Sequence, residues 1–246
     1  MTGDARVLRV PPKDKRKILG TVRGELAAIG DAKRALKMQA YMKSEMPFHG
    51  VPAPVFKVLI RSLFKGLVFA DFDELAAAVR AVWHGAKFRE ERYAAIRLLD
   101  RRALQPAAPA LALLEELIST GAWWDLVDDV ANHFLHPLLV SDPAITKRTL
   151  RRWSRGDDLW LRRAAIVAQV NEGEAIDSAL LFEVIELAID EKAFFLRKAI
   201  GWALRSLAKV RPHEVRAWLD EYGERASGLT RREAMKGLVG RKQRGA

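Results

Sequence analysis

The spacing of apolar residues is the feature of this sequence that most constrains its fold. From about Arg16 onward, apolar residues recur at the three- and four-residue intervals of an amphipathic α-helix. Alternating β-branched runs bounded by turn residues, which are typical of strands, are almost absent. The sequence therefore predicts an all-α chain.

Short breaks separate the expected helices. Segments such as "HGVPAP", "NEGEAIDS" and "RASGLT" supply the Gly, Pro, Asp and Ser residues that end and cap helices, and none is long enough to be an interdomain linker. The expected helices cover residues 16–29, 32–45, 53–67, 72–84, 88–104, 108–119, 123–137, 143–154, 158–170, 176–190, 193–208, 212–223 and 229–239.

The regular succession of helix pairs indicates a repeat architecture. Pairs of roughly 35 to 45 residues are typical of HEAT-like α-solenoids, because one pair cannot bury its apolar faces without neighbours. We expect one domain over residues 16–246, made of about six antiparallel pairs with a basic concave face, preceded by a mobile basic arm at residues 1–15. A compact globular helical domain is the structural alternative.

The net charge of the chain indicates which classes of partner it favours. Lys and Arg number 42 against 31 Asp and Glu, a net charge of +11, which favours DNA, RNA or an acidic membrane surface. A generally basic solvated surface is the other interpretation. The chain has no cysteine, its five histidines show no metal-ligand spacing, and no apolar run reaches the length of a membrane span. We therefore expect a soluble cytoplasmic protein.

Two adjacent tryptophans begin an acidic stretch, "WWDLVDD". On a helical wheel Trp123 falls in the apolar sector with Leu126 and Val130, so we expect it to be buried. Trp124 and Asp128 lie one turn apart and outside that sector. The same test places Arg163 about 150° from the apolar sector of its own helix, which predicts that it points outward.

A third tryptophan shares this polar placement. Trp202 falls with Lys198 and Arg205 on the side opposite the apolar stripe of 193–208. The intervals from Asp128 to Arg163 and from Arg163 to Trp202 each equal about one helix pair, so these residues are expected on one layer of the solenoid. The alternative is structural: the tryptophans are contacts between layers and Asp128 forms a salt bridge with Arg163.

At these residues the chain resembles the AlkD-like family of DNA alkylation repair enzymes, which are HEAT-like-repeat DNA glycosylases. The resemblance covers about residues 35–240. It rests on "WWDLVDDVA" at 123–131, "WLRRAAI" at 160–166, "FFLRKAIGWALR" at 194–205 and "TRREAMKGL" at 230–238, with a weaker match at 41–54.

The resemblance implies excision of cationic alkylated purines, chiefly N3-methyladenine and N7-methylguanine, from duplex DNA without a deep base-flipping pocket, a metal or another cofactor. It assigns the catalytic aspartate to Asp128, the cleft tryptophans to Trp124 and Trp202, and the accompanying arginine to Arg163. We expect a monomer. The expected DNA contacts are Tyr41, Lys43, Lys198, Arg205, Arg231 and Lys236.

Two rival functions stay open from the sequence. A HEAT-like module could grip damaged or branched DNA without cutting it, although a pure binder gains nothing from a carboxylate that faces phosphate. A solenoid scaffold for other proteins is the second rival. Phosphate binding weakens steeply as salt rises, so salt-dependent DNA affinity separates the scaffold from the other two functions.

Overall fold

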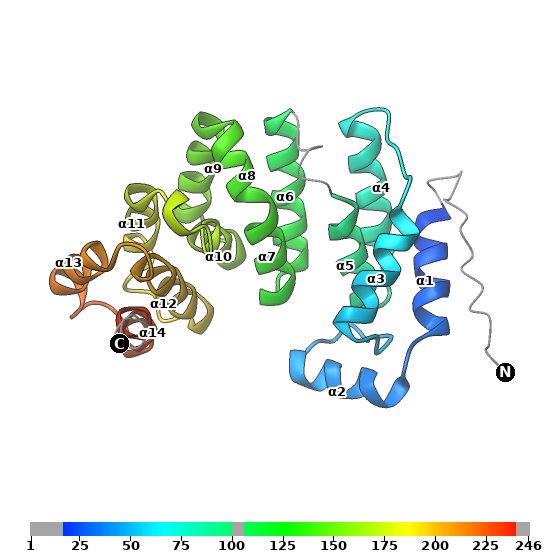
Figure 1. Cartoon of the computed structure of the whole chain (residues 1–246), viewed down its shortest axis with the longest axis horizontal. Helices are drawn as coiled ribbons and strands as arrows, with labels where there is room; N and C mark the ends of the chain where they lie inside the picture. Colours follow the sequence, from blue (N-terminus) through cyan, green and yellow to red (C-terminus); the bar gives the residue numbers. More distant parts are fainter. Residues whose placement is uncertain (1–16, 100–105, 240–246) are drawn as a thin grey trace, which may run out of the picture. The chain divides into compact units, whose positions relative to one another are not determined.

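All regular structure in residues 17–99 and 106–239, the part of the chain that this computed structural model describes, is helical (Figure 1). No β-strand occurs in these residues. The predicted fold class is confirmed: the chain is all-α, and within each part its helices pack on one another in a manner consistent with an α-solenoid of helix pairs.

The described residues form two compact units. The prediction of a single domain over residues 16–246 stays a prediction, and the arm predicted at residues 1–15 lies outside the described residues. The first unit contains α1 (Ile18–Ala28), α2 (Ala32–Met42), α3 (Ala53–Phe64), α4 (Phe72–Gly85) and α5 (Arg89–Leu98).

The core of the first unit forms between α1, α4 and α5, which pack on one another. Leu26, Val79, Trp83 and Ile96 are completely buried there. Each supplies an apolar side chain from the buried face of an amphipathic helix, as the periodicity predicts.

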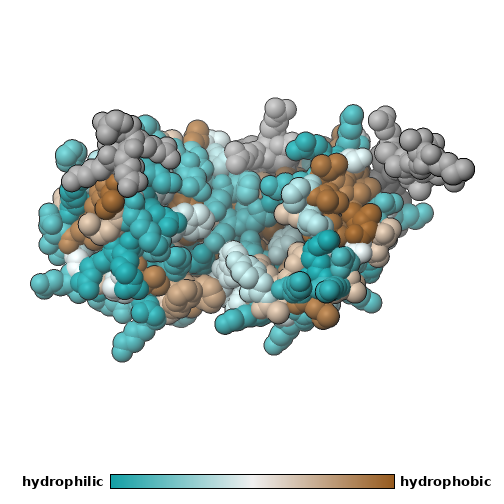
Figure 2. Space-filling model, turned by 60° about the horizontal axis from the view of Figure 1, so that its bottom comes forward, coloured by the Kyte–Doolittle hydropathy of each residue, from teal (hydrophilic) through white to brown (hydrophobic). Residues whose placement is uncertain are grey.

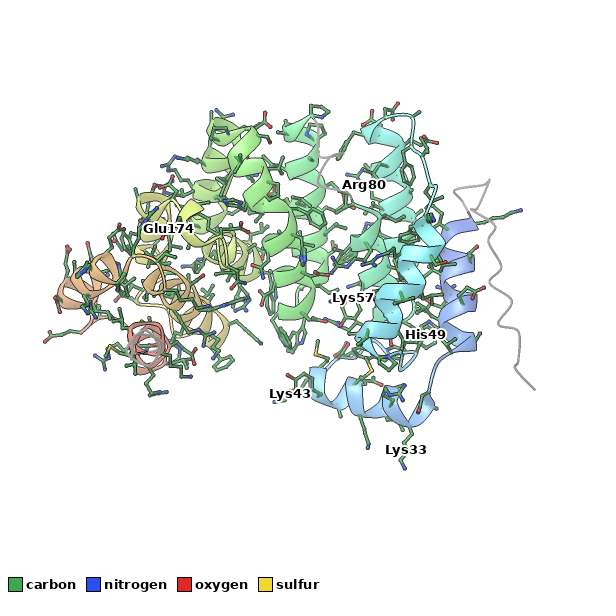
Figure 3. All side chains as sticks on the ribbon, in the orientation of Figure 1. Lys33, Lys43, His49, Lys57, Arg80 and Glu174 are labelled. Carbon is green, nitrogen blue, oxygen red and sulfur yellow. The ribbon has the colours of Figure 1, made fainter. Side chains whose placement is uncertain are left out.

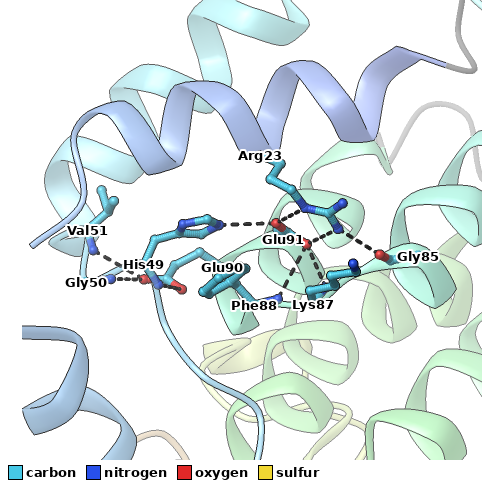
Figure 4. A network of polar contacts seen from close by, with 9 residues as sticks. All are labelled: Arg23, His49, Gly50, Val51, Gly85, Lys87, Phe88, Glu90 and Glu91. Atoms are coloured by element: carbon cyan, nitrogen blue, oxygen red, sulfur yellow. Dashed lines mark hydrogen bonds and ion pairs between the residues drawn. The ribbon is translucent and has the colours of Figure 1, made fainter. Parts of the chain in front are cut away.

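A buried carboxylate, Glu91, ties α5 to the rest of this unit (Figure 4). Arg23 on α1 binds both of its oxygens, at 2.8 and 2.9 Å. The backbone N–H of Lys87 donates at 2.7 Å, and the His49 Nε2 atom lies 3.2 Å away. Burial alone would raise the pKa of Glu91, but these contacts outweigh it and hold the pKa below its usual value.

The neighbouring carboxylate, Glu90, holds the loop between α2 and α3. It is buried and accepts the backbone N–H groups of His49, Gly50 and Val51 at 2.9 to 3.2 Å (Figure 4). Gly50 has φ 83°, and a Cβ atom there would lie 2.1 Å from the Asp31 carbonyl oxygen, so only glycine fits this turn. Glu90 thereby satisfies backbone donors that the loop would otherwise bury without partners.

Helix α2 is shorter than predicted. Lys43 adopts a left-handed conformation with φ 49° and ends the helix there, before residue 45. Its N-terminus is capped by Asp31, whose carboxylate accepts the Arg34 N–H at 2.8 Å. Met42 is the one buried residue of α2.

The second unit carries the remaining helices. They are α6 (Ala107–Gly121), α7 (Trp124–Val130), a π-helical segment η3 (Ala131–Leu135), α8 (His136–Ser141), α9 (Pro143–Arg155), α10 (Leu159–Val167), a 3₁₀ turn η4 (Gly173–Ala175), α11 (Ser178–Glu186), α12 (Phe194–Ala208), α13 (Pro212–Tyr222) and α14 (Gly228–Val239). Their bounds agree with the predicted helices to within a few residues, except where 123–137 was expected to be a single regular helix.

That helix is widened in its middle. Residues Ala131–Leu135 form a π-helical segment that joins α7 to α8. The backbone stays in the right-handed helical region at both junctions. Pro137 explains the irregularity, because its nitrogen has no hydrogen to donate and its ring clashes with the carbonyl one turn earlier. The segment follows directly after the predicted site residues of α7.

Four helices of this unit form a row, in which α7 packs on α10, α10 on α12, and α12 on α14 (Figure 1). We call α7, α10, α12 and α14 the four-helix row. Helices α6 and α9 pack behind its first members, and α13 behind its last two. Leu114, Val130, Ile166 and Leu204 are buried between these layers.

Candidate functional site

One charged residue stands at the same repeat position in each helix of the four-helix row. Asp128, Arg163, Lys198 and Glu233 follow one another at intervals of 35 residues. Since 35 residues is also the interval between successive helices of the row, their side chains come together in pairs: Asp128 with Arg163, and Lys198 with Glu233. We call these four residues the charge ladder.

The Asp128–Arg163 pair joins α7 to α10. The Arg163 guanidinium donates to both Asp128 oxygens, at 2.8 and 2.7 Å, and its third nitrogen donates to the Phe195 carbonyl at 2.6 Å. The arginine side chain is 4% exposed and the aspartate side chain 14% exposed. The structure therefore brings these two predicted site residues together, with the carboxylate the more accessible of the two.

The prediction that Arg163 points outward is wrong. A wheel drawn on α10 alone does not include the neighbours on either side, and both α7 and α12 pack against this helix. Arg163 lies between them, where its charge is compensated by Asp128 and its Nη1 donates to a backbone carbonyl. The salt bridge that the sequence left open as an alternative is present.

Burial raises the pKa of the Asp128 carboxyl above its usual value. The hydrogen bonds and positive charge of Arg163 oppose this effect, while the carboxylates of Asp125 and Asp129 add to it. Asp128 is thus largely removed from water, and its surroundings stabilise the ionised carboxylate less well than water does.

The tryptophans are placed partly as predicted. Trp124 and Trp202 are half-buried, on α7 and α12, as expected. The expectation that Trp123 is buried is wrong, because it too is half-buried. Trp123 precedes the helix with extended backbone angles, φ −155° and ψ 145°, so a helical wheel misplaces its side chain.

Trp123 belongs to an aromatic cluster that the sequence analysis missed. Its ring centroid lies 5.8 Å from that of Trp160 and 5.4 Å from that of Phe195, and the last two are 4.9 Å apart. Phe194, which is 55% exposed, packs edge-on against Phe195 at 5.5 Å. Because Arg163 donates to the Phe195 carbonyl, this cluster is anchored to the Asp128–Arg163 pair. Trp160 and Phe195 stand 35 residues apart, which is the signal that would have found them.

Three predicted DNA-contacting residues converge on a carboxylate that was not predicted. Lys198, Arg205 and Lys236 all bind Glu233, at 2.9, 2.5 and 2.7 Å. Glu233 is 4% exposed, whereas the three cationic side chains are 40%, 31% and 61% exposed. Hydrogen bonds from Lys236 and Lys198 lower the pKa of Glu233 to about 2. We call these four residues the Glu233 cluster.

The other predicted contacts lie apart from these groups. Arg231 is exposed and its guanidinium donates to the Gly223 carbonyl at 2.9 Å. Tyr41, 77% exposed, belongs to the first unit, in the last turn of α2. Lys43 follows directly after that helix (Figure 3). Figure 2 shows a mainly hydrophilic face with separate hydrophobic patches.

Within residues 17–99 and 106–239, no group of three or more His, Asp or Glu side chains is arranged to hold a metal ion. In the same residues, no helix has the length and apolarity needed to cross a bilayer.

The all-α fold thus carries a partly accessible aspartate, held by a buried arginine, on a helix that also carries a half-buried tryptophan. The sequence profile of the family described as DNA alkylation repair enzyme matches residues 22–238, and the chain belongs to that family. It therefore has a role in the repair of alkylated DNA.

One solved structure agrees with this membership. A protein from Enterococcus faecalis, described as a predicted DNA alkylation repair enzyme, superimposes with a TM-score of 0.74 and 27% sequence identity. The match covers 84% of this chain and 95% of that one. A search of curated protein sequences finds no match.

Proposed function

We propose that the protein is a DNA glycosylase that removes positively charged alkylated purines, N3-methyladenine and N7-methylguanine, from duplex DNA. The observation that carries this proposal is the Asp128 carboxylate, which is desolvated, held in place by one bidentate arginine and still partly open to solvent. A carboxylate in this state attracts a cation that develops beside it more strongly than one in water.

The reaction needs little more than such an anion. Cleavage of an N-glycosidic bond builds positive charge on the sugar in an oxocarbenium-like transition state. Asp128 opposes that charge and orients the attacking water. The water oxygen bonds to the sugar carbon as the bond to the base nitrogen breaks, and the water gives up one proton to the Asp128 carboxylate, which passes it to solvent. A purine that already carries a positive charge departs as a neutral base, so no strong general acid is required.

The aromatic residues supply contacts for the cationic substrate. Trp124 lies one helical turn before Asp128 and is half-buried, so part of its ring is available to a sugar or base. Cation–π attraction to such a ring contributes about 1 kcal/mol, and more when water is excluded. We assign the same contact with the sugar or base to Trp202 on α12, which is also half-buried.

Arg163 acts through Asp128 in this proposal. Each of its three nitrogens donates to the Asp128 carboxylate or the Phe195 carbonyl, and its side chain is only 4% exposed. We therefore assign Arg163 to positioning the carboxylate rather than to a DNA phosphate. The phosphate contacts fall to the exposed cations and to Tyr41: Tyr41, Lys43, Lys198, Arg205, Arg231 and Lys236.

The buried ion pair also supports a second function. An aspartate that is fully used in holding α10 to α7 would serve a non-catalytic module that only binds damaged DNA. The two functions differ in product: a glycosylase releases free base, whereas a binding module retains the alkylated duplex unchanged.

The deciding experiment is single-turnover incubation of the chain with duplex DNA that contains one N7-methylguanine. We expect release of the free base and an abasic strand that alkali cleaves. Tight, salt-dependent binding of the same duplex without release of base would identify a binding module, and absence of both would leave only a scaffold.

A further inference from the structure

The Glu233 cluster contains more positive charge than one carboxylate needs. Lys198, Arg205 and Lys236 each bind Glu233 directly, which leaves two of their three charges uncompensated within the cluster. The carboxylate lies beneath, 4% exposed, and the partly exposed cations lie above it. What the cluster presents to solvent is therefore cationic.

Attachment of α14 to α12 does not require these three cations. A Cβ at Gly201 would lie 2.6 Å from the Glu233 Cβ, and one at Gly237 would lie 2.6 Å from the Arg205 carbonyl, so glycines let the two helices pack backbone to backbone. The Thr230 hydroxyl adds a hydrogen bond to the Arg197 carbonyl. Partly exposed ion pairs contribute little to stability, typically up to about 1 kcal/mol each.

The arrangement matches the requirements of a phosphate site. Three donors from two helices point at one location, and a buried anion holds them there before any ligand arrives, so less side-chain entropy is lost on binding. A phosphodiester oxygen approaching from solvent meets ammonium and guanidinium groups, the usual partners of DNA phosphates. Glu233, below them, is shielded from the ligand.

We propose that Lys198, Arg205 and Lys236, organised by Glu233, bind one backbone phosphate of duplex DNA at a fixed distance from the excised base. This inference rests on the proposed function. The Asp128–Arg163 pair bridges α7 and α10, and the Glu233 cluster bridges α12 and α14. The two groups are thus two helix spacings apart, about 16–20 Å. For a duplex whose axis follows the four-helix row, at about 3.4 Å per base pair, the phosphate lies roughly five or six base pairs to one side of the lesion.

A pair of asymmetric duplexes tests this distance. Each carries one N7-methylguanine, with about three base pairs on one side and about twelve on the other, and the two duplexes are mirror images in this respect. Release of base is measured under single-turnover conditions at increasing protein concentration. The variant is Lys198→Gln/Arg205→Gln, and the control is Arg225→Gln, which removes a positive charge elsewhere on the second unit and breaks the exposed ion pair with Asp190.

We expect the double variant to raise the half-saturating protein concentration tenfold or more on one duplex and hardly at all on its mirror, with the maximal rate unchanged. Its salt dependence should flatten by about one unit of slope per lost phosphate contact, on the sensitive duplex only. Arg225→Gln should change neither quantity. Lys236→Gln, at a side chain 61% exposed, gives the same asymmetry in weaker form should the double variant fail to fold.

Equal losses on both duplexes, or loss on neither, would overturn the inference while wild-type release of base leaves the proposed function standing. Failure of the wild-type chain to release base from either duplex would overturn both.

Discussion

Glu91 in the first unit and Asp128 in the second make the same contact with opposite electrostatic results. Each carboxylate is bound through both oxygens by one arginine, Arg23 or Arg163. Glu91 also accepts a backbone N–H and contacts His49, and its pKa is lowered. Asp128 has acidic neighbours instead, and its pKa is raised.

The difference separates a carboxylate that holds the fold from one that can do chemistry. Glu91 is completely buried and its hydrogen-bonding capacity is filled by its own unit. Asp128 keeps a partly exposed edge and an incompletely compensated charge. An arginine partner alone does not identify a catalytic aspartate; the number of further donors and the accessibility of the oxygens do.

The largest effect expected from the difference between Glu91 and Asp128 is on stability. Glu91→Gln should lower the free energy of unfolding by about 3 kcal/mol, because the completely buried amide replaces one of the two acceptor oxygens by an NH2 group that faces the donors of Arg23. Urea denaturation measures the loss, and hydrogen exchange should locate it in α1 and α5. Glu115→Gln is the control: its pair with Arg152 is partly exposed, so less than about 1 kcal/mol should be lost.

The next effect is on catalysis. Asp128→Asn keeps the shape of the side chain and removes the charge that opposes the sugar cation. Base release should fall by about 10²-fold or more, equivalent to about 2.7 kcal/mol, with DNA binding intact or tighter. The loss of stability should be smaller than for Glu91→Gln, since burial already disfavours the Asp128 charge. Release of N7-methylguanine at the wild-type rate would remove Asp128 from the mechanism.

A smaller effect is expected at the arginine. Arg163→Lys keeps one positive charge but cannot bind both Asp128 oxygens and the Phe195 carbonyl together. The maximal single-turnover rate should fall about tenfold, near 1.4 kcal/mol, while the salt dependence of DNA binding is unchanged. A flatter salt dependence would instead show that Arg163 contacts phosphate directly.

The smallest effects are those of pH on stability, and their signs should be opposite. The lowered pKa of Glu91 gives stability that is present above its usual value of 4.5 and is lost as pH falls below it. The raised pKa of Asp128 gives stability that is present below its usual value of 3.8 and is lost as pH rises through the higher folded value. Acidification should therefore shrink the wild-type advantage over Glu91→Gln and increase the advantage over Asp128→Asn, as measured by urea denaturation at each pH.

The fold was predictable because it depends on local patterns. Apolar spacing and capping residues such as Asp158 and Asp177 define helices wherever those helices pack. The π-helical segment before Pro137 was missed, since a proline in a helical pattern predicts a break or kink and does not specify how the backbone adjusts.

The site was predictable only as far as single helices determine it. Trp124 and Trp202 are half-buried as the wheels require. The wheels failed for Trp123, which lies outside its helix, and for Arg163, whose burial is created by the helices beside it. Glu233 was missed because its importance comes from three cations contributed by two helices.

The 35-residue interval of the charge ladder also determines where the chain tolerates changes in length. One residue deleted inside α12, before Lys198, turns that side chain about 100° around the helix axis and separates it from Glu233. One residue deleted from the connection after Ala208 leaves both partners on their helix faces and is absorbed by the loop. Natural insertions and deletions among relatives should therefore gather in the connections of the second unit, and duplications should come in whole repeats, which keep each residue of the charge ladder facing its partner.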